Sequence, residues 1–311
     1  MIIKKTEIPN SEDTSLILLI QGAPGVGKTT LCASAEEPFI LDVDHGLKRV
    51  RAEYRADSSD ARTLDEIKAD VEEVKRLGYK TLAIDTVGAL LDSMTQQLIK
   101  DKPSLAQTDG TLTQKGYGAL KAVFLAFSAD VRASFRNTIF VFHEVSTKVD
   151  DNIFYDIIAS GSAKNLVYQP ADLAARLFIQ DGKRYLGFTP TEQYNAKSSF
   201  GIKGLIEVPE LKDGDKNDFL TRLFALARQN IQKEAEAFAP QNEAYDLAIK
   251  AGTEIVNGLE KPEDVPAILE AIAGIKHAST SEKEIKAALK KKMAELKIVY
   301  NREKKVYEQA E

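Results

Sequence analysis

Residues 22–29 have the types and spacing of a loop that binds a triphosphate. They read Gly-Ala-Pro-Gly-Val-Gly-Lys-Thr and match G-x-x-x-x-G-K-[ST] at every fixed position. Gly22 and Gly27 permit backbone angles that turn successive amides toward phosphate oxygens, and the start of a following helix adds positive potential. Lys28 is expected to reach the β- and γ-phosphates, and the Thr29 hydroxyl to ligate Mg²⁺. The loop predicts binding of ATP, or alternatively GTP, with Mg²⁺. The residues expected to contact the nucleotide are Gly22, Ala23, Pro24, Gly25, Val26, Gly27, Lys28, Thr29 and Thr30.

A magnesium site of this kind also needs a carboxylate at the end of a neighbouring strand. Asp85 follows the apolar run 81–84 and is the candidate. It is expected to hold magnesium through water, beside Thr29. The alternative is an ordinary turn aspartate at the end of a strand.

The elements that must position these residues alternate between short apolar runs and helical patterns. Strands are expected at 15–21, 38–43, 81–84 and 137–142, and helices at 28–35, 63–77, 87–100 and 112–135. Such alternation predicts an α/β fold, with a mostly parallel sheet covered by helices on both faces.

The pattern changes after residue 143. Residues 145–162 are polar and predict a loop, whereas two runs that flank Asp181-Gly182 predict a β-hairpin. After a helix at 215–227, the remaining signals are helical, at 242–257, 263–273 and 281–309. We therefore predict a core at 1–230 and a small all-helical C-terminal domain at 231–311, with a linker near 238–240.

Composition places the chain among globular proteins. Of 311 residues, 43% are hydrophobic and 29% charged, and no apolar run is long enough to span a bilayer. Cys32 is the single cysteine, so no internal disulfide can form, which favours a reducing cytoplasm. No membrane association is expected.

Charge is unevenly distributed along the chain. The net charge of −5 argues against a protein whose whole surface is positively charged for non-specific binding of nucleic acid. Residues 276–305, however, hold ten Lys or Arg against four Asp or Glu, with Lys290, Lys291 and Lys292 in a row. This segment is either the solvated face of a packed helix or an accessory surface for DNA or a protein partner.

Several segments beyond the loop resemble the RecA core in the right order across roughly residues 15–205. Residues 39–47 are similar to the strand that carries the water-activating glutamate, with Asp44 at that position. Residues 84–90 resemble the RecA segment in which Asp-Ser-Val is followed by small and apolar residues. Residues 139–143 resemble the strand that ends in a γ-phosphate sensor, here His143. Residues 161–177 resemble the region where RecA leaves its second DNA-binding loop.

The resemblance implies a RecA-like P-loop ATPase whose site is completed by a neighbouring copy, in a ring or filament. It implies that Asp44, Lys28 and His143 are catalytic, and that Lys197 reaches the neighbour's ATP. Asp44 stands where the family has glutamate, which shortens the reach to water by one methylene and leaves room for slow hydrolysis.

Within this superfamily the chain is most similar to phage-encoded, Sak-type nucleotide-binding proteins associated with single-strand annealing. That implies action on single-stranded DNA in phage recombination, annealing or replication, with a single-strand-binding protein as a candidate partner. The DNA-facing segments would be 101–118, with Lys102 and Lys115, and 145–165, with Lys148 and Lys164. Their aromatic side chains, which either stack on bases or anchor the loops, are Tyr117, Phe154 and Tyr155.

Two other functions use the same loop. A small-molecule kinase would need an arginine-rich lid, and residues 145–165 contain no arginine. A nucleotide-dependent regulatory or interaction protein would bind ATP and turn it over slowly, without acting on DNA.

Overall fold

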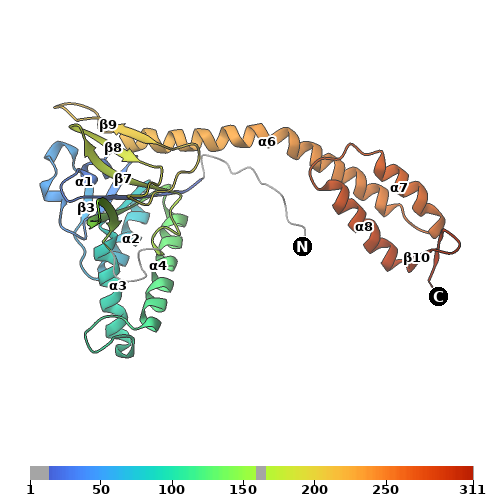
Figure 1. The fold of residues 1–311 in the computed structure, drawn as a ribbon, viewed down its shortest axis with the longest axis horizontal. Coiled ribbons are helices and arrows are strands. Elements are labelled where there is room, and N and C mark those ends of the chain that lie inside the picture. The colour runs from blue at the N-terminus through green and yellow to red at the C-terminus, as the bar shows by residue number, and fades with distance from the viewer. Residues whose placement is uncertain (1–13, 159–165, 311) are drawn as a thin grey trace. The chain divides into compact units, whose positions relative to one another are not determined.

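The computed structural model describes residues 14–158 and 166–310 (Figure 1). Two compact units divide the chain, one that ends at Ile231 and one that begins at Gln232. The division into a core at 1–230 and a helical C-terminal domain at 231–311 stays a prediction.

A single nine-stranded sheet forms the centre of the first unit. Its strands are β1 (Leu16–Gly22), β2 (Pro38–Leu41), β3 (Asp57–Ser59), β4 (Thr81–Asp85), β5 (Asn137–Val149), β6 (Asn152–Ile157), β7 (Leu173–Gln180), β8 (Lys183–Gly187) and β9 (Leu205–Val208). They run in the order β3-β2-β4-β5-β1-β7-β8-β9, with β6 paired to β5. The pairs from β3 to β7 are parallel, and β8 and β9 add an antiparallel edge.

Both faces of this sheet are buried, because alternate residues of β1 belong to different hydrophobic clusters. Ile17 and Leu19 pack with the helices α2 (Leu64–Leu77), α3 (Val87–Asp101) and α4 (Gln114–Ser134). Leu18 and Ile20 pack on the other face with α1 (Lys28–Cys32) and the start of α6 (Phe219–Asn257). This arrangement confirms the predicted α/β fold class.

Strand register brings the predicted polar residues to one edge of the sheet. β5 lies between β1 and β4, with Gly22 opposite His143 and Asp85 opposite Val141. Because parallel strands end at the same edge, the P-loop, Asp85 and His143 gather there.

The predicted loop at 145–162 is wrong for its first part. β5 continues to Val149 and pairs antiparallel with β6 through an Asp150-Asp151 turn. The segment has β-branched and aromatic residues at alternating positions, which favour a strand even though the polar residues between them suggest a loop.

The second unit is mostly helical, as predicted, but not wholly so. It contains the later part of α6, α7 (Val265–Ala273) and α8 (Ser281–Glu295), packed around Val265, Ile272 and Ile285. The predicted helix at 281–309 stops after Glu295, and β10 (Ile298–Asn301) pairs with β11 (Val306–Gln309). Lys297 at φ 53° breaks the helix, and valine and tyrosine favour the strands.

The predicted linker at 238–240 is also wrong, because Pro240 lies inside α6. An interior proline costs a helix about 3 kcal/mol. Good helix formers on both sides, chiefly alanine, glutamate and lysine, let the helix continue.

Candidate nucleotide-binding site

The phosphate-binding loop leads from β1 into α1, and its two fixed glycines are required for different reasons. At Gly22 a Cβ atom would lie 2.6 Å from the carbonyl oxygen of Leu177 on β7, so the sheet leaves no room for a side chain. Gly27 has a φ of 103°, in the left-handed region that favours glycine. The expectation of special backbone angles therefore holds for Gly27 and is wrong for Gly22.

Backbone amides at the start of α1 are available to a ligand. Within the described chain, no residue accepts a hydrogen bond from the amides of Gly27, Lys28 or Thr29. Such first-turn amides are natural donors to phosphate oxygens. α1 ends at Cys32 and not at the predicted residue 35, so these individual amides matter more than a long helix dipole.

Lys28 is held inside the loop. Its side chain is buried, and its Nζ donates hydrogen bonds to the carbonyl oxygens of Gly22 and Ala23, each at 2.9 Å. Burial lowers the pKa of Lys28, and the nearby Asp85 carboxylate opposes that shift. A phosphate that displaces the two carbonyls would give the ammonium a charged partner in place of neutral ones.

Thr29 and Asp85 are in direct contact. Oγ1 of Thr29 donates to Oδ2 of Asp85 at 2.5 Å, and Asp85 is only 4% exposed. Burial raises the pKa of Asp85, while the Thr29 hydroxyl and the Lys28 ammonium act in the opposite direction. The peptide bond that follows Asp85 is cis.

This hydroxyl–carboxylate pair fits magnesium brought by a nucleotide. Mg²⁺ takes one or two protein oxygens and fills its other positions with phosphate oxygens and water. Across residues 14–158 and 166–310, no group of three or more His, Cys, Asp or Glu could hold a metal ion. The donor set therefore suits a shared metal better than a resident one.

His143 connects Lys28 to Asp44. Its Nδ1 lies 3.1 Å from Nζ of Lys28, and its Nε2 lies 3.0 Å from Oδ2 of Asp44. An ammonium group can only donate, so Nδ1 accepts and Nε2 carries the hydrogen that is donated to Asp44. The three predicted catalytic residues thus form one chain of contacts. Their roles stay predictions.

Asp42, which the sequence analysis did not single out, shapes the segment that carries Asp44. Its carboxylate accepts hydrogen bonds from the amides of Gly46 at 2.7 Å and Leu47 at 3.0 Å. The Asp44 amide donates to the carbonyl of Asp85 at 3.1 Å. Aspartate side chains often accept hydrogen bonds from nearby backbone amides in turns, and this preference could have marked Asp42 as a supporting residue.

A buried ion pair beside the loop was also missed. Arg176 donates to both carboxylate oxygens of Glu144, at 2.8 and 2.9 Å, and the two side chains are 11% and 4% exposed. The Arg176 guanidinium lies 3.4 Å from the centre of the Tyr155 ring. No local pattern pairs Glu144 with Arg176, since they meet only through the sheet.

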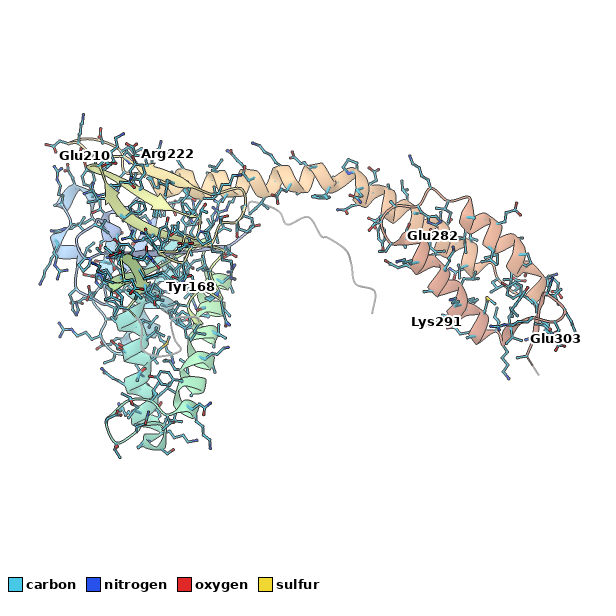
Figure 2. All side chains as sticks on the ribbon, in the orientation of Figure 1. Tyr168, Glu210, Arg222, Glu282, Lys291 and Glu303 are labelled. Atoms are coloured by element: carbon cyan, nitrogen blue, oxygen red, sulfur yellow. The ribbon has the colours of Figure 1, made fainter. Side chains whose placement is uncertain are left out.

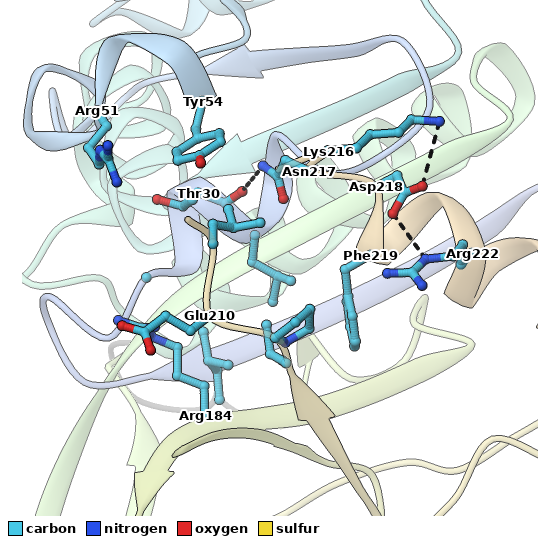
Figure 3. A pocket seen from close by; sticks show the side chains of 16 residues that line it. Thr30, Arg51, Tyr54, Arg184, Glu210, Lys216, Asn217, Asp218, Phe219 and Arg222 are labelled. Atoms are coloured by element: carbon cyan, nitrogen blue, oxygen red, sulfur yellow. Dashed lines mark hydrogen bonds and ion pairs between the residues drawn. The ribbon is translucent and has the colours of Figure 1, made fainter. Parts of the chain in front are cut away.

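One cavity of about 220 Å³ adjoins the loop through Gly27 and Thr30. Figure 3 shows Arg51 and Tyr54 on one side of it and Arg184 on the other. Arg184 donates to the carbonyl of Val26 at 3.0 Å. Four cations and two aromatic residues line it, together with the carboxylates of Glu210 and Asp218 and several aliphatic side chains. Of the lining, only the loop was predicted from the sequence.

Another cavity, of about 440 Å³, lies on the Asp44 and His143 side. It extends between α3 and α4 and is lined there by Asp92, Thr111 and Tyr117. Burial raises the pKa of Asp92. In contrast to the first cavity, no lysine or arginine of the described chain lines this one.

The structure places other predicted residues away from the loop. Nζ of Lys197 donates a hydrogen bond to the carbonyl of Ala171 at 2.5 Å, and its backbone pairs with Ala174. Ala174 lies opposite Leu19 of β1, three residues before the P-loop begins at Gly22. Lys197 does not reach the P-loop of its own chain, and a contact with a neighbour's ATP stays a prediction. Lys164 and residues 161–165 lie outside the described residues.

The predicted DNA-facing aromatics have structural partners. Tyr117 packs against the core cluster, and Tyr155 lies under Arg176. Phe154, at the β5–β6 hairpin, is 37% exposed. Lys102, Lys115 and Lys148 are exposed.

Comparison with known proteins identifies a domain family and a number of similar solved structures. The family model described as "AAA domain" matches residues 14–200. A KaiC-like protein of the archaeon Pyrococcus horikoshii is 14% identical, with 64% of this chain and 90% of that chain covered and a TM-score of 0.35. An ATPase of the type III secretion system of pathogenic bacteria is 13% identical, with 90% and 84% covered and a TM-score of 0.34. No curated protein matches the sequence.

In the part of the chain that the structure describes, no helix has both the length and the apolar character needed to cross a bilayer.

Proposed function

Because this chain belongs to the AAA domain family, whose model covers most of its core, we propose that it is a magnesium-dependent ATPase that acts on single-stranded DNA. The observation that carries the ATPase proposal is the meeting of Lys28, Thr29 and Asp85 at one sheet edge. The amides of the loop and the Lys28 ammonium bind the phosphates, and Thr29 and Asp85 hold Mg²⁺. When bound, the metal neutralises charge on the phosphate oxygens.

Asp44 orients the attacking water, and His143 senses the γ-phosphate. The support is a series of two contacts, from Lys28 to His143 and from His143 to the Asp44 carboxylate. When a phosphate binds the Lys28 ammonium, Nδ1 of His143 loses its hydrogen-bond donor. Nucleotide binding therefore changes the hydrogen bonding of His143, which also contacts Asp44.

The nucleoside occupies the cavity beside Gly27 and Thr30. Tyr54 and the guanidinium groups of Arg51 and Arg184 supply an aromatic surface and positive charge next to the phosphates. ATP is the proposed nucleotide, with GTP as the alternative.

Single-stranded DNA is proposed from the resemblance to Sak-type proteins of phages, which act in recombination, annealing or replication. On this proposal the protein assembles as a ring or filament, Lys197 approaches the neighbour's ATP, and a single-strand-binding protein is a possible partner. A regulatory protein that binds ATP and hydrolyses it slowly is the alternative that the shorter Asp44 leaves open.

A small-molecule kinase is a second candidate, favoured by the cavity that Asp44, His143 and Asp92 line. A phosphoryl acceptor with hydroxyl or amino groups could lie there, next to Asp44. The absence of lysine and arginine from its described lining disfavours an anionic acceptor.

ATP turnover with Mg²⁺, with and without a thymidine oligonucleotide, tests these functions. Lys28→Ala is expected to lose about 1.5–3 kcal/mol of a charge-assisted contact, which is roughly ten- to a hundredfold in affinity or turnover. Lys68→Ala, an exposed lysine on α2, is the control. Unchanged turnover in Lys28→Ala would refute the ATPase assignment. Stimulation by the oligonucleotide supports action on DNA, whereas phosphate transfer to an added nucleoside supports the kinase.

A further inference from the structure

The C-terminal unit presents a lysine face that the nucleotide site does not use. We define this lysine face as Lys283, Lys286 and Lys290 of α8. Figure 2 labels Glu282 and Lys291 on the same helix. Spacings of three and four residues place the three lysines on one side of the helix, and all three are exposed. Ile285 and Leu289 are buried on a different side, in the cluster that holds the unit together.

Within residues 14–158 and 166–310, only one lysine of this face has a carboxylate partner. Among the described residues, Lys286 pairs only with Glu282 one turn away, at 2.6 Å, and no carboxylate pairs with Lys283 or Lys290. The neighbouring Lys291 contacts Glu295 at 4.0 Å, the outer limit of an ion pair. Two of the three ammonium groups are therefore free to meet an external anion.

Along the sequence of this unit, most carboxylates precede residue 276 and most lysines follow it. Residues 232–275 contain three Lys or Arg and nine Asp or Glu, whereas residues 276–305 contain ten and four. If the lysines served only to balance charge and keep the unit in solution, ion pairs with these nine carboxylates would be expected. None of the described carboxylates in 232–275 forms an ion pair with α8.

The turn between β10 and β11 extends the basic segment. Arg302 and Lys305 are exposed there, and Tyr300 on β10 is 49% exposed. The Tyr300 and Tyr307 rings lie 5.0 Å apart, and Tyr307 packs against the hydrophobic cluster of this unit, so the exposed ring is that of Tyr300. Exposed lysines together with an exposed aromatic ring in one unit suit a ligand with both phosphates and flat bases.

We propose that the lysine face binds the phosphate backbone of single-stranded nucleic acid. Lysines on flexible stems make point-charge contacts with phosphates and need no fixed geometry, which suits a sequence-independent polyanion. The choice of single-stranded DNA rests on the proposed function. Binding at the lysine face needs neither ATP nor the P-loop.

The test uses the full chain without nucleotide and a fluorescent thymidine oligonucleotide, titrated at several salt concentrations. The triple variant Lys283→Ala, Lys286→Ala, Lys290→Ala is expected to bind at least tenfold more weakly at low salt. For single strands, each lost phosphate contact lowers the slope of log affinity against log salt by about 0.7, so three lost contacts lower it by about 2. The matched control replaces three exposed lysines of the core, Lys48, Lys68 and Lys203, and is expected to bind as the wild type does.

Two further variants distinguish loss of the lysine charges from misfolding and from loss of the ATPase. A triple Lys→Arg variant of the lysine face keeps the charge and should restore binding, which excludes misfolding as the cause. Lys28→Ala should bind the oligonucleotide normally while losing ATP turnover, so failure of the ATPase proposal is seen separately. Equal binding by the alanine triple and the wild type would overturn the proposal. So would displacement of the oligonucleotide by poly-glutamate at equal charge concentration, which would identify an acidic protein surface as the ligand.

Discussion

The P-loop edge of the sheet and the lysine face of α8 both offer positive charge to phosphate, but they do so by opposite physical means. At the P-loop, Lys28 is 5% exposed and already hydrogen-bonded to two carbonyl oxygens. On α8, Lys283 and Lys290 are exposed, and no described carboxylate pairs with them. The first region can select one phosphate geometry, whereas the second can only attract negative charge.

The difference shows what burial adds to a cation. A buried ammonium and its fixed partners interact in a medium of low dielectric constant, where geometry matters and salt has little effect. Salt screens the interactions of an exposed ammonium, and these interactions lose little free energy when the side chain moves. Chemistry on a nucleotide is therefore expected at the first region and adjustable binding at the second.

The largest expected effect is a loss of stability when the buried ion pair between Arg176 and Glu144, beside the P-loop, is broken. Arg176→Ala leaves the Glu144 carboxylate buried without a partner and should lower the free energy of unfolding by about 3–5 kcal/mol. Urea titration of the variant measures the loss. Replacing both residues, as in Arg176→Met with Glu144→Leu, should recover most of it. If Arg176→Ala lowered the free energy of unfolding no more than Lys290→Ala does, the buried and exposed regions would not differ as described.

Asp44→Asn should separate binding from turnover at the P-loop edge. The amide keeps the shape and the contact with His143 but loses the negative charge that orients water, so turnover should fall by about a hundredfold or more. ATP affinity, measured by calorimetry, should stay within a few-fold of wild type. Glu282→Gln is the matched exposed change on α8 and should leave both unchanged. An equal loss of affinity would show that Asp44 holds the nucleotide instead.

Asp85→Asn should change stability in a pH-dependent way. Because burial raises the pKa of Asp85, the folded chain binds this proton more tightly than the unfolded chain does. The stability contributed by the protonated form is fully present below the unfolded pKa and is lost as pH rises through the folded pKa. Without nucleotide, Asp85→Asn should therefore melt at a higher temperature than wild type at neutral pH.

Thermal melts from acidic to neutral pH measure this difference, which should shrink as the pH falls and the Asp85 carboxyl becomes protonated. Magnesium-dependent turnover should be lost at the same time. A variant that melts lower than wild type at neutral pH would mean that the contacts of Asp85 with Thr29 and Lys28 outweigh its burial.

The smallest expected effect is that of one exposed lysine. Lys290→Ala alone should weaken binding of a thymidine oligonucleotide by less than about fivefold at physiological salt, since exposed charge contacts contribute about 0.2–1 kcal/mol each. Fluorescence anisotropy measures it. A loss as large as that of the triple variant would show that Lys290 occupies a specific pocket.

Local patterns allowed the prediction of the loop and its neighbours, because each depends on few consecutive residues. The glycine spacing at 22–29, the turn at Asp181-Gly182 and the Thr63 start of α2 all appear in the structure. The β5–β6 hairpin and the continuity of α6 through Pro240 were not predicted. In both, neighbouring residues with a strong strand or helix preference outweighed a polar or helix-breaking signal.

The sequence by itself determined the phosphate-binding loop, the alternation of strands and helices, and the basic segment after residue 275, because each is encoded by neighbouring residues. Only the tertiary structure decided that Arg176 neutralises Glu144, that Asp42 supports the Asp44 segment and that His143 joins Lys28 to Asp44. These contacts depend on which strands are adjacent and in what register, since a shift by one residue turns each side chain to the opposite face of the sheet.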